Sequence, residues 1–124
     1  MTKWANLIAG GVAGTVARYL IAGWVYGIAG TAFPYGTLVV NLSGCAIIGF
    51  LAALSDDKLV LGPDAKILLM VGFCGAYTTF STFMLETANL MKYGENLKAL
   101  ANIFTSVILG FLAFKIGLLI GEII

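Results

Sequence analysis

Long apolar runs alternate with short breaks along the whole chain. Charged residues gather mainly around residues 56–66 and 92–98, and a third break, at residues 27–36, holds glycines and a proline. The blocks between these breaks have about the ~20 residues that a helix needs to cross a bilayer. The pattern predicts one all-α membrane domain over residues 1–124 with four spans, near 4–27, 36–54, 66–91 and 97–121.

Composition supports this interpretation. Of the 124 residues 60% are hydrophobic and 10% charged, whereas a soluble domain has roughly 45–50% apolar residues. The sequence contains no histidine, so a catalytic triad or a transition-metal cluster has no material, and we predict that the protein is not an enzyme. Cys45 and Cys74 fall inside predicted spans, where we expect packing rather than redox chemistry. No nucleic-acid partner is expected.

Two polar side chains stand out in the first two spans. Gly10 and Gly14 in "AGGVAGTVARY" let another helix approach closely. Arg18, on the same helix, costs about 2.5–3.5 kcal/mol at membrane depth, so we expect it to snorkel or to face an aqueous vestibule. Asn41 interrupts the second span, and its amide must face protein or water. It can be an interhelical hydrogen-bonding group or a donor in an ion pathway.

The distribution of lysines bears on orientation. With four spans, Lys3, Lys58 and Lys66 share one side of the membrane, and Lys92 and Lys98 lie on the other. Three against two barely biases insertion. Four short helices can hardly enclose a pathway alone, so we predict an antiparallel, dual-topology homodimer with a two-fold axis in the membrane plane.

The third span contains "GFCGAYTTFSTF" (72–83), in which Gly72 and Gly75 precede two threonines. Glycines and hydroxyls of this kind are typical of a broken membrane helix. The break predicts either a kink sealed by its own hydroxyls or freed carbonyls that bind a hard cation such as sodium across the dimer axis. Phe80 and Phe83 follow on one helical face. They can be ordinary packing residues, or their positive ring edges can meet an anion in a dry pore.

The segments "GTLVVNLSG" (36–44), "GFCGAYTTFSTFMLET" (72–87) and "GTVARY" (14–19) resemble the Fluc family of bacterial fluoride channels, also called CrcB-like proteins, and the resemblance covers the whole chain. It implies a multi-pass protein of the bacterial inner membrane that exports fluoride passively through two pores of an antiparallel homodimer. It also implies a broken third helix and a structural sodium ion that is not transported. By position, the sodium-binding carbonyls fall on Gly75 and Thr78.

The same resemblance implies the fluoride pathway. It places the pore phenylalanines at Phe80 and Phe83, the pore asparagine at Asn41, and a hydroxyl track at Ser81 and Thr82, with Arg18 attracting anions near the mouth. On the fourth helix the family often has an aromatic hydroxyl, and here Asn102 stands at that position, followed by Thr105 and Ser106.

Two other functions remain open from the residues. A proton-coupled cation exporter of the small multidrug resistance kind has the same length and span number, but it needs an intramembrane carboxylate in the first helix, where this chain has Arg18 and no acid. Glu86 in the third span could substitute for that carboxylate. A non-conducting accessory subunit would explain the packing glycines but leaves the polar stripe of the third span unexplained.

Overall fold

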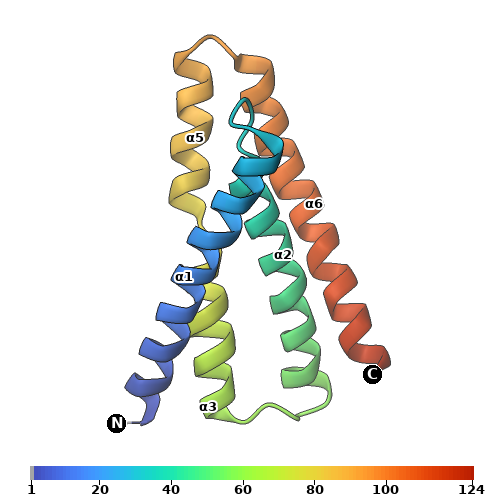
Figure 1. Ribbon diagram of the computed structural model, residues 1–124. Coiled ribbons are helices and arrows are strands. Elements are labelled where there is room, and N and C mark those ends of the chain that lie inside the picture. The colour runs from blue at the N-terminus through green and yellow to red at the C-terminus, as the bar shows by residue number, and fades with distance from the viewer. Residues whose placement is uncertain (1) are drawn as a thin grey trace.

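Four helical passes lie side by side in the computed structural model, which describes residues 2–124 (Figure 1). The first pass is the single helix α1 and the fourth is α6, while π-helical turns widen the second and the third, which are built from several segments. The segments are α1 (Thr2–Ala29), α2 (Tyr35–Ala52), η1 (Ala53–Asp57), α3 (Pro63–Lys66), η2 (Ile67–Cys74), α4 (Gly75–Tyr77), α5 (Phe80–Lys92) and α6 (Asn96–Ile123).

All four passes are long and apolar enough to cross a membrane, so the four predicted spans are confirmed and the protein is a multi-pass membrane protein. The observed passes are Thr2–Ala29, Tyr35–Asp57, Pro63–Lys92 and Asn96–Ile123. They extend the predicted spans by one to three residues at each end, because helices continue past the apolar core of the bilayer into the headgroup region.

Glycines set the distance between helices. A Cβ atom added at Gly49 in α2 would overlap the carbonyl oxygen of Phe114, and one at Gly117 in α6 would overlap that of Ala46. The backbones of α2 and α6 therefore touch directly, as small residues allow in membranes, where lipid gives no hydrophobic drive for association.

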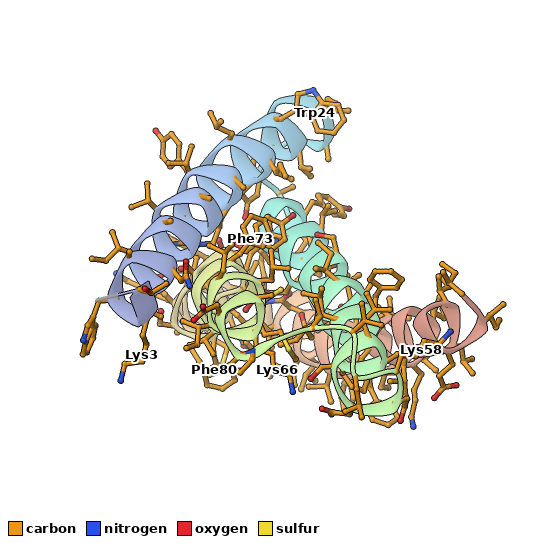
Figure 2. All side chains as sticks on the ribbon, turned by 90° about the horizontal axis from the view of Figure 1, so that it is seen from below. Lys3, Trp24, Lys58, Lys66, Phe73 and Phe80 are labelled. Atoms are coloured by element: carbon orange, nitrogen blue, oxygen red, sulfur yellow. The ribbon has the colours of Figure 1, made fainter. Side chains whose placement is uncertain are left out.

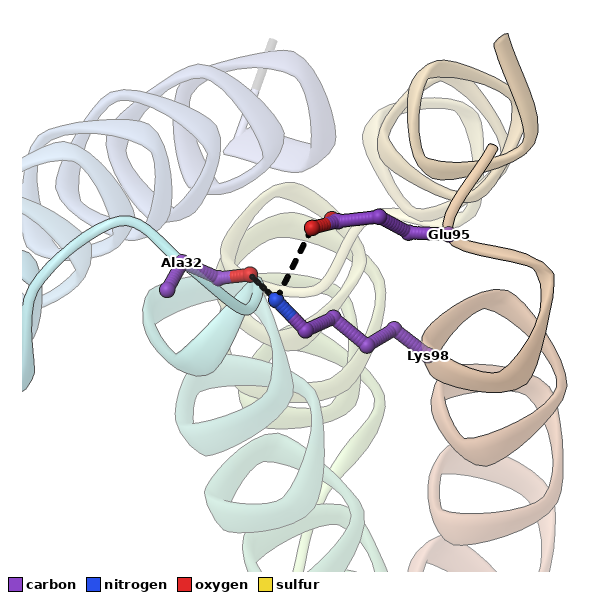
Figure 3. Close-up of polar contacts among 3 residues, drawn as sticks. All are labelled: Ala32, Glu95 and Lys98. Carbon is purple, nitrogen blue, oxygen red and sulfur yellow. Dashed lines mark hydrogen bonds and ion pairs between the residues drawn. The ribbon is translucent and has the colours of Figure 1, made fainter. Parts of the chain in front are cut away.

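The two ends of the bundle differ. Both chain termini lie at one end with the loop that precedes α3, and the α5–α6 turn lies at the other (Figure 1). Viewed from the first end, Lys3 lies on α1, Lys66 on α3 and Lys58 directly after η1 (Figure 2). At the opposite end, Lys98 Nζ donates to the carbonyl oxygen of Ala32 at 3.3 Å and pairs with Glu95 at 3.1 Å (Figure 3). Lys98 thus ties the α1–α2 loop to the start of α6.

Much of the apolar surface is uncovered. Trp24 is 68% exposed and points away from the other helices, and Phe80 is 72% exposed at the outside of the bundle (Figure 2). In a membrane protein such side chains face lipid or another chain.

Candidate functional site

The third pass is broken at two threonines. Thr78 (φ −84°, ψ 156°) and Thr79 (φ −147°, ψ 123°) are extended and separate α4 from α5. The hydroxyl of Thr79 accepts a hydrogen bond from the backbone N–H of Thr82 at 3.2 Å, which caps the new helix. The predicted break is present, and a side chain of the break itself starts the second half-helix.

The glycines do not make this break, contrary to our expectation. Gly75 is helical, with φ −61° and ψ −35°, and Gly72 lies within η2. A Cβ atom at Gly72 would lie 3.0 Å from the Cα of Gly10. Gly72 therefore lets α1 approach, and the chain leaves the helix only where Thr78 turns to extended backbone.

Asn41 of α2 holds the break from one side. Its amide oxygen accepts a hydrogen bond from the Thr79 N–H at 2.8 Å, and its Nδ2 donates to the Thr79 carbonyl at 3.0 Å. The side chain thus satisfies both backbone groups that the missing helical turn leaves free. One N–H of the amide remains for another acceptor.

Other donors satisfy the carbonyls just before the break. Arg18 Nε donates to the Ala76 carbonyl at 3.0 Å, and Thr78 Oγ1 donates to the Cys74 carbonyl at 2.9 Å. Within residues 2–124, the carbonyls of Gly75 and Thr78 receive no side-chain hydrogen bond. The family resemblance assigns these two oxygens to a cation.

A cavity of about 290 Å³ lies beside the break. Phe80 and Phe83 approach with ring centroids 5.8 Å apart and planes tilted by 55°, and Phe83 is buried while Phe80 is exposed. The structure brings both rings together with Asn41 and Thr78 around this space, whose further lining includes Gly44, Cys45, Cys74, Thr79 and Ser106.

A second cavity, of about 330 Å³, brings Arg18 together with Thr82 and Glu86. Glu86 Oε1 accepts hydrogen bonds from Tyr26 Oη at 3.0 Å and from Thr37 Oγ1 at 2.8 Å. Its Oε2 is buried without a partner in the part of the chain that the structure describes. Thr79 lines both cavities.

Two predicted pathway residues lie apart from both cavities. Ser81 is exposed on the outside of α5 and lies 3.5 Å from the hydroxyl of Thr79. Asn102 is 2% exposed, and its Nδ2 donates to Thr87 Oγ1 at 2.9 Å, which in turn donates to the Phe83 carbonyl at 2.7 Å. Hydrogen bonds through Thr87 thus connect Asn102 to the backbone of Phe83, whose side chain lines the first cavity.

A family model described as "CrcB-like protein, Camphor Resistance (CrcB)" matches residues 5–118. The chain belongs to the CrcB family. It is 41% identical over 124 residues to the fluoride-specific ion channel FluC of Maridesulfovibrio salexigens, and this alignment covers 100% of this chain and 98% of that relative. It is 49% identical over 121 residues to the fluoride-specific ion channel FluC of Magnetococcus marinus, and this alignment covers 98% of this chain and 97% of that relative. The resemblance in the sequence is therefore confirmed.

The structure of this CrcB family member also brings in residues that the sequence analysis missed. Tyr26 and Thr37 hold Glu86, and Thr87 connects Asn102 to α5. For Tyr26 a signal existed, since it stands eight residues after Arg18 and therefore on the same helical face. Thr37 and Thr87 gave no comparable signal.

Proposed function

We propose that the protein is a fluoride-selective channel of the bacterial inner membrane. Fluoride leaves the cytoplasm passively after hydrogen fluoride has entered by diffusion and dissociated inside. The observation that carries this proposal is the cavity at the break, where two phenylalanine rings and the amide of Asn41 face one space. The relatives with 41% and 49% identity are named fluoride-specific channels, which favours the same ion here.

The lining suits a small, strongly hydrated anion. The edges of the Phe80 and Phe83 rings carry partial positive charge and can stabilise an anion without a full charge that would hold it too tightly. The free N–H of Asn41 replaces part of the lost hydration. Arg18 and Thr82, in the neighbouring cavity, raise the local anion concentration and continue the donor path. Several weak sites in series favour rapid passage.

We further infer an antiparallel homodimer with two pores. The ring of Phe80 is 72% exposed next to the break, and a single chain does not cover it. A second, inverted copy would cover it and would enclose the pathway, and the near balance of lysines permits both orientations.

A sodium ion at the dimer axis fits the same arrangement. The carbonyls of Gly75 and Thr78 lack side-chain donors within residues 2–124, and Gly75 is exposed on the outside of the chain. Two such chains would offer four oxygens, which is the ligand type that a hard cation prefers. The ion would neutralise the mutual repulsion of these dipoles. It would stabilise the dimer and would not be transported.

The test is efflux from liposomes that contain the full-length protein. Fluoride should leave rapidly when a potassium ionophore carries the balancing charge, and chloride should not leave under the same conditions. Chloride passing as readily as fluoride would reject the channel assignment. Proton-coupled export of an organic cation would favour the exporter instead, although α1 carries no acid and Glu86 Oε1 already accepts two hydrogen bonds.

The sodium site has a separate test. Replacing sodium on both sides by N-methylglucamine should lower fluoride flux over hours, while no sodium current should appear with sodium present. Flux and dimer stability that are indifferent to complete sodium removal would refute the cation site and leave the channel assignment intact.

A further inference from the structure

One face of α1 contacts the broken pass turn after turn. Gly10 and Gly14 stand four residues apart, and Cβ atoms on them would overlap the carbonyl oxygens of Leu68 and Phe73. Arg18 follows four residues later and therefore lies on the same face. The two glycines thus bring α1 into backbone contact with η2 and fix where the Arg18 side chain begins.

From this position Arg18 reaches the last turn before the break. Its Nε donates to the Ala76 carbonyl at 3.0 Å. That carbonyl belongs to α4, which ends at Tyr77, so it has lost its helical partner and lies at the negative end of a half-helix. The Nε–H of the Arg18 guanidinium gives this carbonyl the hydrogen bond that it lacks, in a fixed direction.

The peptide held by Arg18 lies between the two predicted cation ligands. Gly75 precedes Ala76, and Thr78 comes two residues after it. On the other side of the break, Asn41 holds the next residue, Thr79, with two hydrogen bonds. Only Tyr77 and Thr78 lie between the two fixed residues, so the direction of the Thr78 carbonyl depends on both restraints, and the Gly75 carbonyl directly precedes the residue that Arg18 holds.

We propose that Arg18 is a positioning residue for the cation site: its Nε fixes the Ala76 peptide so that the Gly75 and Thr78 carbonyls keep the directions in which a cation can be bound. This inference rests on the proposed sodium site. It gives Arg18 a role that is distinct from attracting anions, because the role depends on an N–H at one position of the side chain and not on net charge.

Two substitutions separate the roles of donor and charge. Arg18→Gln keeps an N–H donor attached to Cδ, the carbon that carries Nε in arginine, and loses the charge. Arg18→Lys keeps the charge but has a methylene group at that position, and its ammonium lies one atom further out. Leu20→Ala, at a side chain 62% exposed on α1, is the control for a change in this helix.

The measurement is fluoride efflux as a function of sodium concentration, at constant ionic strength with N-methylglucamine. We expect Arg18→Lys to raise the half-saturating sodium concentration by about tenfold or more, since the hydrogen bond that fixes the Ala76 peptide is lost. Arg18→Gln should keep this concentration within about threefold of the unmodified chain while its maximal flux falls. Leu20→Ala should behave like the unmodified chain.

The reverse order, with lysine normal and glutamine shifted, would overturn the inference, as would equal sodium dependence in both variants. Sodium-dependent thermal stabilisation of the purified protein in detergent gives the same comparison if a variant conducts too little to measure. If the unmodified chain does not respond to sodium at all, the cation site is refuted and this inference falls with it. If the unmodified chain responds to sodium but the two Arg18 variants have the same sodium dependence, the cation site stands and this inference alone is refuted.

Discussion

Replacing Asn41 by leucine tests how the break is held. The change removes both hydrogen bonds to Thr79, at 2.8 and 3.0 Å, and leaves a backbone N–H and a carbonyl unpaired. Each unpaired buried group costs about 1–3 kcal/mol. Thr79 is only partly buried, so water can relieve part of this cost, and we expect a total loss of about 2–3 kcal/mol. This corresponds to a fall in melting temperature of roughly 5–10 °C.

Two readouts are needed, because Asn41 both holds the backbone and faces the cavity. Asn41→Asp keeps the acceptor for the Thr79 N–H but replaces the donor by a carboxylate oxygen beside the Thr79 carbonyl, so it should abolish most flux and also lower stability. Asn41→Leu should lower both, the flux by at least about tenfold. Asn96→Leu, at an exposed amide that begins α6, is the matched control. A leucine variant with unchanged melting temperature and unchanged efflux would refute this account of the break.

Phe80→Ile and Phe83→Ile keep apolar bulk but remove the aromatic quadrupole, and each should strongly reduce fluoride efflux while the dimer still assembles. If both variants show a normal efflux rate at equal protein density, the two rings are ordinary packing residues. Two lysines added to the 55–65 loop should fix one orientation, and two added beside Lys92 should fix the other, so that each variant alone is inactive and the mixture is active. Reporter fusions that find one orientation for the unmodified chain would contradict dual topology.

The spans and the glycine face of α1 could be predicted because both are local patterns. Twenty apolar residues decide a span without reference to neighbours, and glycines four residues apart mark a close approach whatever the partner is. The sequence does not indicate that Gly72 is the residue that Gly10 approaches. The contact between Gly72 and Gly10 joins residues of different passes, and no spacing along the chain encodes it.

The position of the break was only partly predictable. Glycine is the usual sign of irregular backbone, yet Gly75 stays helical because nothing forces it out. The chain opens at Thr78 and Thr79, where Asn41, from another helix, replaces the hydrogen bonds that Thr79 loses. The Glu86 cluster escaped prediction for a similar reason, since Tyr26 and Thr37 meet that carboxylate only after three helices have packed.

The π-helical turns of η2 have a consequence for insertions and deletions in this protein's evolution. In η2 the backbone bonds to the fifth residue before it, as the Gly75 N–H does to the Met70 carbonyl, so the segment contains more chain than an α-helix of equal height. Loss of one residue between Ile67 and Val71, before Gly72, can be absorbed by a return to α-helical bonding. The register of the glycine contact and of the break would then be kept, and variation in length would be tolerated in η2 sooner than in the α-helical stretches on either side.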